Sequence, residues 1–131
     1  MAQEFKFDLV SPERLLLSEN VEAVVVPGTD GDMTVMALHA PTMTTVRPGV
    51  VTVMRQGGSE KFVVFGGFAD ITPDGCMLLA ESAVRVADLD RADLERNVQM
   101  AREDVRDAKD DMTRSKAQEY LDHLLTMQAA L

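Results

Sequence analysis

Residues 68–81 read FADITPDGCMLLAE, and this stretch divides the chain into two parts with different local patterns. Two short apolar segments, FADIT and CMLLAE, flank a reversal at Pro73-Asp74-Gly75, where proline and glycine favour a turn. Gly75 is also the last of eight glycines, and all five prolines precede it. Because glycine and proline mark turns and destabilise helix interiors, the chain before this point is predicted to be turn-rich and the remainder helical.

The segments up to residue 87 have the patterns of β-strands. Phe5, Phe7 and Leu9 alternate with polar residues in EFKFDLV, which is the period of a half-buried strand. Two adjacent glycines within residues 56–59 predict a tight hairpin. Further strands rich in Val, Phe and Thr are predicted at VEAVVV, TVMAL, VVTVMR, KFVVFG, FADIT and MLLAE. Since no helix-sized crossover separates these segments, we predict an antiparallel β-sandwich of about ten strands.

From Asp88 onward the apolar residues recur every three or four positions, as on one face of a helix. One stripe consists of Leu94, Val98, Ala101 and Val105, and a second consists of Ala117, Leu121, Leu124, Gln128 and Leu131. The stripes are out of phase, which predicts a break near residues 107–111 and an antiparallel helical hairpin. The predicted fold is therefore α+β, with a sandwich domain over residues 1–87 and a hairpin domain over 88–131. The two stripes need burial against each other, against the sandwich or against a partner.

Composition excludes several classes of function. The formal charge is −9 and no basic cluster exists, so we expect no nucleic-acid partner. Cys76 is the single cysteine, which leaves no internal disulfide and no CxxC metal site, and its apolar setting predicts a buried thiol. The start of the chain has neither a secretory signal nor a transit peptide, and no apolar run approaches the roughly 18 residues of a membrane span. We expect a soluble chain that faces the cytosol.

Few residues are available for catalysis. His39 and His123 are the only histidines, so few pairs of a nucleophile and a histidine base are available. No metal-ligand spacing and no phosphate-binding loop occurs, and Gly66-Gly67 alone does not make one. We expect no catalytic residue, no metal and no cofactor. His39 is interpreted as a structural or interface residue.

Five colinear motifs resemble the ε subunit family of bacterial F-type ATP synthases. Residues 31–41, GDMTVMALHAP, resemble the family's GxLGxxxxHAP segment, and residues 47–50 resemble its PG-V turn. Residues 66–71 and 79–83 resemble its GGF and LAexA strands, and residues 89–90 the Leu-Asp that opens its first C-terminal helix. Family members usually carry Gly at position 34 and Pro-Gly at positions 37 and 38, where this chain has Thr, Ala and Leu.

The resemblance implies a non-catalytic central-stalk subunit that couples rotation of the c-subunit ring and the γ subunit to ATP synthesis. It implies a peripheral position on the cytoplasmic side of the bacterial inner membrane, reached only through the complex. It further implies a regulatory C-terminal hairpin that contacts the catalytic α and β subunits. The partner interface that it implies consists of Gly31, Asp32, His39, Ala40 and Pro41, with Asp32 facing the polar loops of c.

Some family members bind nucleotide through an LDxxRA motif. Here Leu89 and Asp90 are present, but Asp93 holds the position of the motif's Arg, and Arg91 lies two residues earlier. Two residues turn a helix by about 200°, so we expect ATP to bind weakly or not at all.

Two other classes of protein remain as alternatives. A free-standing β-sandwich adaptor or small-ligand binding module is the main one, but an exposed apolar stripe on the hairpin favours a permanent partner instead. The third hypothesis, a cupin-type enzyme, is disfavoured because the chain has too few histidines.

Overall fold

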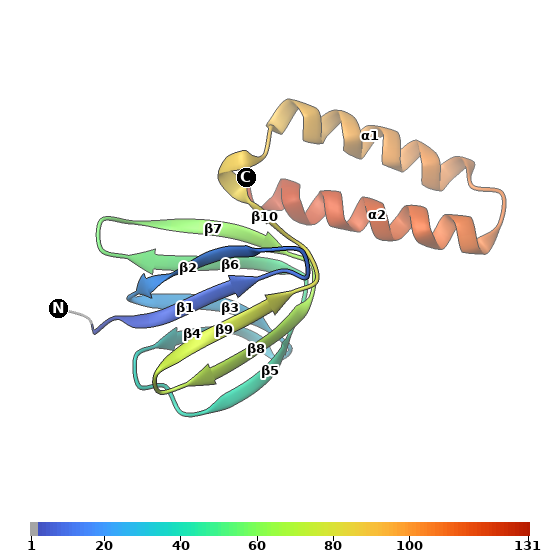
Figure 1. Cartoon of the computed structure of the whole chain (residues 1–131). Helices are drawn as coiled ribbons and strands as arrows, with labels where there is room; N and C mark the ends of the chain where they lie inside the picture. Colours follow the sequence, from blue (N-terminus) through green and yellow to red (C-terminus); the bar gives the residue numbers. More distant parts are fainter. Residues whose placement is uncertain (1–2) are drawn as a thin grey trace. The chain divides into compact units, whose positions relative to one another are not determined.

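A computed structural model describes residues 3–131, and this part of the chain forms ten strands followed by two α-helices (Figure 1). The strands are β1 (Phe5–Val10), β2 (Leu15–Val21), β3 (Ala23–Gly28), β4 (Gly31–Met36), β5 (Thr42–Val46), β6 (Gly49–Arg55), β7 (Gly58–Val64), β8 (Gly67–Thr72), β9 (Gly75–Ala80) and β10 (Ala83–Arg85). A short 3-10 helix, η1 (Val86–Asp88), precedes α1 (Arg91–Asp107) and α2 (Asp111–Ala129). This order confirms the predicted α+β class.

The ten strands form one hydrogen-bonded sheet that curls on itself, so that its two halves enclose a core (Figure 1). One half runs β4-β3-β6-β7-β10 and the other β5-β8-β9-β1-β2, and the register pair Gly28–Val46 joins them. The predicted sandwich is confirmed. Its strands pair antiparallel except β1 and β9, which are parallel. A parallel pair needs a long connection, which the intervening strands supply.

Most predicted strands and turns lie where the sequence placed them. Phe5, Phe7 and Leu9 are buried, and the side chains between them are more exposed. The glycine pair within residues 56–59 turns β6 into β7, and Gly57 has a φ of +94° there. The segment VEAVVV is divided, because Val21 ends β2 and β3 begins two residues later. β2, β5 and β10 were not predicted.

The sandwich core consists of apolar side chains from both halves of the sheet, among them Phe7 of β1 and Phe62 of β7. Cys76 of β9 belongs to this core, as predicted, and is 3% exposed. Burial, and then the charges of Asp70 and Asp8, raise the pKa of its thiol to about 12. The thiol is therefore protonated at neutral pH.

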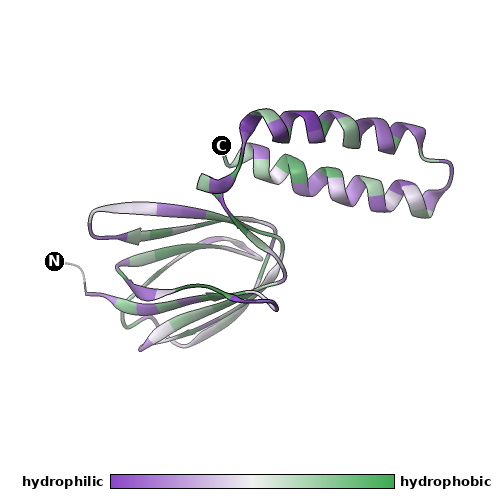
Figure 2. Ribbon diagram, turned by 45° about the horizontal axis from the view of Figure 1, so that its top comes forward, coloured by the Kyte–Doolittle hydropathy of each residue, from purple (hydrophilic) through white to green (hydrophobic). Residues whose placement is uncertain are grey.

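The two helices form the predicted hairpin, with the break at residues 108–110. Asp90 caps α1 by accepting a hydrogen bond from the Asp93 N–H at 3.0 Å, and Asp110 caps α2 in the same way from Thr113 at 2.7 Å. α1 is the more hydrophilic helix (Figure 2). A second core within the hairpin consists of Leu94, Val98, Ala101, Leu121 and Leu124.

The helices thus bury their stripes against each other. The expectation of an exposed apolar stripe was wrong, because the out-of-phase break lets the second helix cover the first. The apolar stripes of the hairpin therefore do not distinguish a stalk subunit from a free-standing module.

The chain divides into two compact units, and the division falls between Arg85 and Val86. The predicted boundary lay two residues later, after Ala87. Independent folding of each unit remains a prediction. Neither helix of residues 3–131 combines the length and the apolar character that are needed to cross a membrane.

Candidate functional site and docking surfaces

The first predicted interface segment, Gly31-Asp32, opens β4 directly after the turn at residues 29–30. Asp32 accepts a hydrogen bond from Nη2 of Arg47 at 2.9 Å, and Nε of Arg47 donates to the Gly28 carbonyl at 3.0 Å. Both charged side chains remain exposed to solvent. Asp32 is therefore half of a surface ion pair, which contributes little to stability and remains accessible to a partner.

The second predicted segment, His39-Ala40-Pro41, follows the end of β4. Its half-buried imidazole donates from Nδ1 to the Ala40 carbonyl at 2.7 Å, and Oγ1 of Thr42 donates to the same oxygen at 3.0 Å. Ala40 and Pro41 themselves are exposed. One ring nitrogen of His39 therefore holds the loop in shape, as expected of a structural or interface histidine.

Leu38 lies in the same loop and has a φ of +64°, the only positive φ of a non-glycine residue in the part of the chain that the structure describes. Glycine adopts this conformation at no steric cost, whereas a leucine is strained there. The loop therefore keeps the backbone that the family's usual glycine suits. It also presents a leucine side chain that is 67% exposed.

β4 separates the two predicted interface segments. Gly31 and Asp32 lie at its start, whereas residues 39–41 follow its end at Met36. A strand rises about 3.3 Å per residue, so the ends of this six-residue strand lie about 17 Å apart. The two segments are therefore attached to opposite ends of β4, although Thr42, directly after Pro41, lines one groove with Gly31 and Asp32.

A third surface, which we call the outer apolar face, consists of Met43, Phe68, Met77 and Leu79 on strands β5, β8 and β9. These side chains are 67%, 39%, 47% and 45% exposed, respectively. In the strand register Phe68 lies opposite Leu79, and Asp70 lies between Met43 and Met77. Adjacent exposed apolar side chains on neighbouring strands are typical of a protein interface.

Sequence reasoning missed this face, although β9 carried a signal for it. Its residues from Cys76 to Ala80 are all apolar, whereas a strand with one solvated face alternates. Cys76, Leu78 and Ala80 are buried in the core, so Met77 and Leu79 must point outward. A strand that is apolar on both faces indicates that one face packs in the core and that a partner covers the other.

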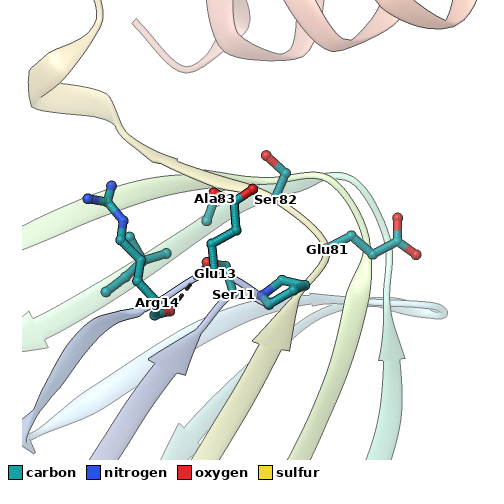
Figure 3. A pocket seen from close by; sticks show the side chains of 8 residues that line it. Ser11, Glu13, Arg14, Glu81, Ser82 and Ala83 are labelled. Carbon is teal, nitrogen blue, oxygen red and sulfur yellow. Dashed lines mark hydrogen bonds between the residues drawn. The ribbon is translucent and has the colours of Figure 1, made fainter.

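A polar pocket lies where the β1–β2 and β9–β10 connections approach each other (Figure 3). Glu13, Arg14, Glu81 and Ser82 line it, and Oγ of Ser11 donates to the Arg14 carbonyl at 3.3 Å. Its lining contains no histidine or cysteine, and carboxylates outnumber the single guanidinium. This arrangement provides neither a nucleophile with its base nor a binding site for phosphate.

The first turn of α1 contains the residues of the degenerate nucleotide motif. Leu89 is half-buried, Asp90 caps the helix, and Arg91 is the exposed first helical residue. Asp93 forms an ion pair with Arg96. The carboxylates of Asp90 and Asp93 thus occupy the helix N-terminus, where a phosphate would otherwise find N–H donors. Within residues 3–131, His, Cys, Asp and Glu side chains do not gather in groups of three or more that would hold a metal ion.

The sandwich matches a known protein family. The beta-sandwich domain model of the ATP synthase delta/epsilon chain matches residues 4–86, well over half of the chain. The chain belongs to the ATP synthase delta/epsilon family. The matched region contains the two predicted interface segments and the outer apolar face.

Relatives named "ATP synthase epsilon chain" align with this family member over its whole length. The protein of Mesorhizobium japonicum is 65% identical, that of Chelativorans sp. 64% and that of Brucella anthropi 53%, and each alignment covers 98% of the relative. The family assignment therefore extends through the helical hairpin as well as the sandwich.

Two solved structures resemble this epsilon-family chain in fold. A chain of the Euglena gracilis mitochondrial ATP synthase, in a structure of OSCP, F1 and the c-ring, gives a TM-score of 0.83 at 24% identity; the match covers 97% of this chain and 81% of the other. A chain of the Tetrahymena thermophila mitochondrial ATP synthase central stalk and c-ring gives 0.65 at 12% identity, with 98% and 97% covered. At these identities the likeness establishes the fold alone.

Proposed function

We propose that this chain is a non-catalytic central-stalk subunit of a proton-translocating F-type ATP synthase. In that role it couples rotation of the c ring and the γ subunit to ATP synthesis. It associates with the cytoplasmic side of the bacterial inner membrane only through the complex. Membership of the delta/epsilon family, and curated relatives with the name ATP synthase epsilon chain, support this proposal.

The observation that carries the proposal is the outer apolar face. Four large apolar side chains on adjacent strands gain free energy when a partner removes them from water, at roughly 25 cal/mol per Å² of apolar surface. A rotor subunit needs such a permanent contact, because torque passes through it in every cycle. We assign this face to the γ subunit.

The two loop surfaces are proposed as further contacts, one at each end of β4. The end with Gly31 and Asp32 is assigned to the polar loops of c. The end with His39, Ala40 and Pro41 supports a separate contact within the stalk. An Asp32→Arg change would place two guanidinium groups together at Arg47, and we expect it to reduce coupling more than folding.

The absence of catalysis is proposed from the chemistry of the candidate nucleophile and base. The Cys76 thiol is buried and protonated, and Nδ1 of His39 is engaged with the main chain. Contact between the hairpin and the catalytic α and β subunits is also proposed, supported by exposed Met100, Met112 and Tyr120.

The test is co-elution of the full chain with purified γ subunit in size-exclusion chromatography, comparing Phe68→Ser with Met100→Ser. Phe68 lies on the outer apolar face, whereas Met100 is an exposed apolar residue of α1. We expect Phe68→Ser to weaken co-elution at least tenfold and Met100→Ser to leave it unchanged. Failure of the unmodified chain to bind γ would contradict the proposed function.

A further inference from the structure

The curled sheet has two seams, at which an edge of one half lies near an edge of the other, and the seams differ. At the first seam, Arg55 of β6 pairs with Glu19 of β2, and Nη2 of Arg85 on β10 donates to the Leu16 carbonyl at 3.1 Å. These contacts close that side of the sandwich with charged groups.

The second seam, between β4 and β5, is joined by the register pair Gly28–Val46 and by a hydrogen bond of 3.2 Å from Oγ1 of Thr29 to the Thr45 carbonyl. Beside this join lies a groove of about 310 Å³, lined by residues 28–33 and 42–44. The second seam therefore has a groove beside its backbone join, whereas charged side chains span the first seam, which has the polar pocket at one end.

The direction of the backbone groups of β4 follows from the contacts of β3. The Pro27 carbonyl accepts from the Arg47 N–H at 2.9 Å, so Pro27 directs its main-chain groups away from β4. In an antiparallel ladder, hydrogen-bonded pairs of opposite residues alternate with pairs whose main-chain groups both point outward. Asp32, the register partner of Pro27, therefore directs its main-chain groups away from β3, and every second residue of β4 does the same. The N–H and C=O groups of Asp32, Thr34 and Met36 therefore lie on the free edge of β4.

This edge lacks the usual devices that protect a sheet edge. After Asp32, β4 reads Met-Thr-Val-Met, with no charge, no proline and no register shift. By contrast, β10 has only three residues, and β2 carries Glu19 and a register shift against β1. An exposed edge without these devices is a ready template for an added strand.

We propose that an extended segment of a partner protein, about five residues long and carrying a basic side chain at one end, adds as a strand to the free edge of β4. This inference goes beyond the proposed function, because it assigns a backbone contact to the edge of β4, whereas the outer apolar face, which shares Met43 with the groove, contributes side chains. Main-chain hydrogen bonds to Asp32, Thr34 and Met36 hold the segment, and the groove beside Thr42 and Thr44 receives its small side chains.

Charge identifies the occupant. Asp30 borders the groove, is exposed, and is absent from the ion pairs of the residues that the structure describes. A lysine or arginine of the added segment compensates it. A second copy of this chain is disfavoured, because two copies with a formal charge of −9 repel each other.

The test is residue-resolved hydrogen–deuterium exchange of the full chain, alone and reconstituted into ATP synthase from which this subunit was removed. Gly31, Met33 and Val35 direct their amides to β3 and serve as the internal control. We expect their exchange to change little, whereas that of Asp32, Thr34 and Met36 slows at least tenfold on assembly. Uniform slowing along β4, or none, would overturn the proposal.

Two substitutions of Thr34 distinguish the contribution of its backbone N–H to assembly from that of its side chain. Thr34→Pro removes an edge N–H that β3 does not use, so the sandwich is expected to fold, and Thr34→Val keeps the backbone and the shape of the side chain. We expect Thr34→Pro to weaken assembly at least tenfold and Thr34→Val to leave it unchanged, with circular dichroism confirming both folds. If both variants assemble normally while Phe68→Ser does not, the added strand is wrong and the proposed function stands.

Discussion

The guanidinium of Arg85 lies over the ring of Phe62, with its central carbon 5.0 Å from the ring centroid. The same group pairs with Glu60 and donates to the Leu16 carbonyl. Glu60 in turn pairs with Arg55, which pairs with Glu19. The last residue of the last strand thus fastens the two halves of the sandwich, immediately before the chain enters the helical unit.

Removal of this side chain is expected to destabilise the sandwich. Arg85→Ala loses a cation–π contact and charge-assisted hydrogen bonds at a partly buried site, for which we expect a loss of about 2 kcal/mol in the free energy of unfolding. Urea denaturation measures it. Arg14→Ala, at an exposed arginine of the same unit, is the control and should stay within about 0.5 kcal/mol. Equal effects of the two changes would contradict the fastening role.

Glu60 makes the same network sensitive to acid. Burial by itself raises the pKa of Glu60, but hydrogen bonds from Arg55 and Arg85 outweigh it and hold the pKa below its ordinary value. A carboxyl group with a lowered folded-state pKa stabilises the fold above its unfolded-state pKa, and this contribution is lost as the pH falls through the folded-state value. We therefore expect Glu60→Gln to reduce the loss of unfolding free energy between about pH 7 and about pH 3. Identical pH profiles for the two proteins would refute this assignment.

Gly67 is predicted to tolerate no side chain. A Cβ built there would lie 2.2 Å from the Leu79 carbonyl oxygen, and the residue has a φ of +150°. Gly57 also has a positive φ, but nothing lies within 4 Å of its Cβ position. We expect Gly67→Ala to lower the free energy of unfolding by about 3 kcal/mol or more and Gly57→Ala by about 1 kcal/mol, measured by thermal denaturation. Equal losses of unfolding free energy in the two variants would mean that backbone strain, rather than the clash with Leu79, causes both.

The sandwich is predicted to fold without the hairpin. Its core is separate from the smaller hairpin core, and helices of 17 and 19 residues depend on tertiary packing for most of their stability. A chain that ends at Ala87 should therefore unfold cooperatively and retain γ binding, whereas residues 88–131 alone should lose much of their helical circular dichroism. A non-cooperative transition in the shortened chain would show that the two units depend on each other.

ATP is expected to bind weakly or not at all. Asp90 and Asp93 place negative charge at the N-terminus of α1, and of the two exposed cations beside them Arg96 already pairs with Asp93, which leaves Arg91. Isothermal titration calorimetry of the full chain should detect millimolar affinity at best. Micromolar affinity that disappears in Arg91→Ala, but persists in Arg102→Ala, would reverse this prediction.

The sequence was sufficient for features whose cause is local. Alternation of Phe5, Phe7 and Leu9 indicated β1, because side chains of a strand point to opposite faces in turn. The phase change between the two apolar stripes indicated the helical break, and Asp90 marked the first helix start. β2 was missed because its three consecutive leucines hide the alternation, and β10 because three residues are too short for a pattern.

Contacts between distant segments were decided only by the tertiary structure. No local pattern reveals that Arg85 bonds to Leu16, 69 residues earlier, or that β1 lies parallel to β9. The motif in residues 31–41 is continuous in sequence, but only the fold shows that its two ends are attached to opposite ends of β4 and that Thr42, directly after it, lines one groove with Asp32. The outer apolar face arises because the sheet register aligns Phe68 with Leu79 and places Met43 and Met77 on either side of Asp70. The hydrophobic pattern and the turns set that register, but which strands become neighbours depends on the packing of the whole core rather than on any one segment.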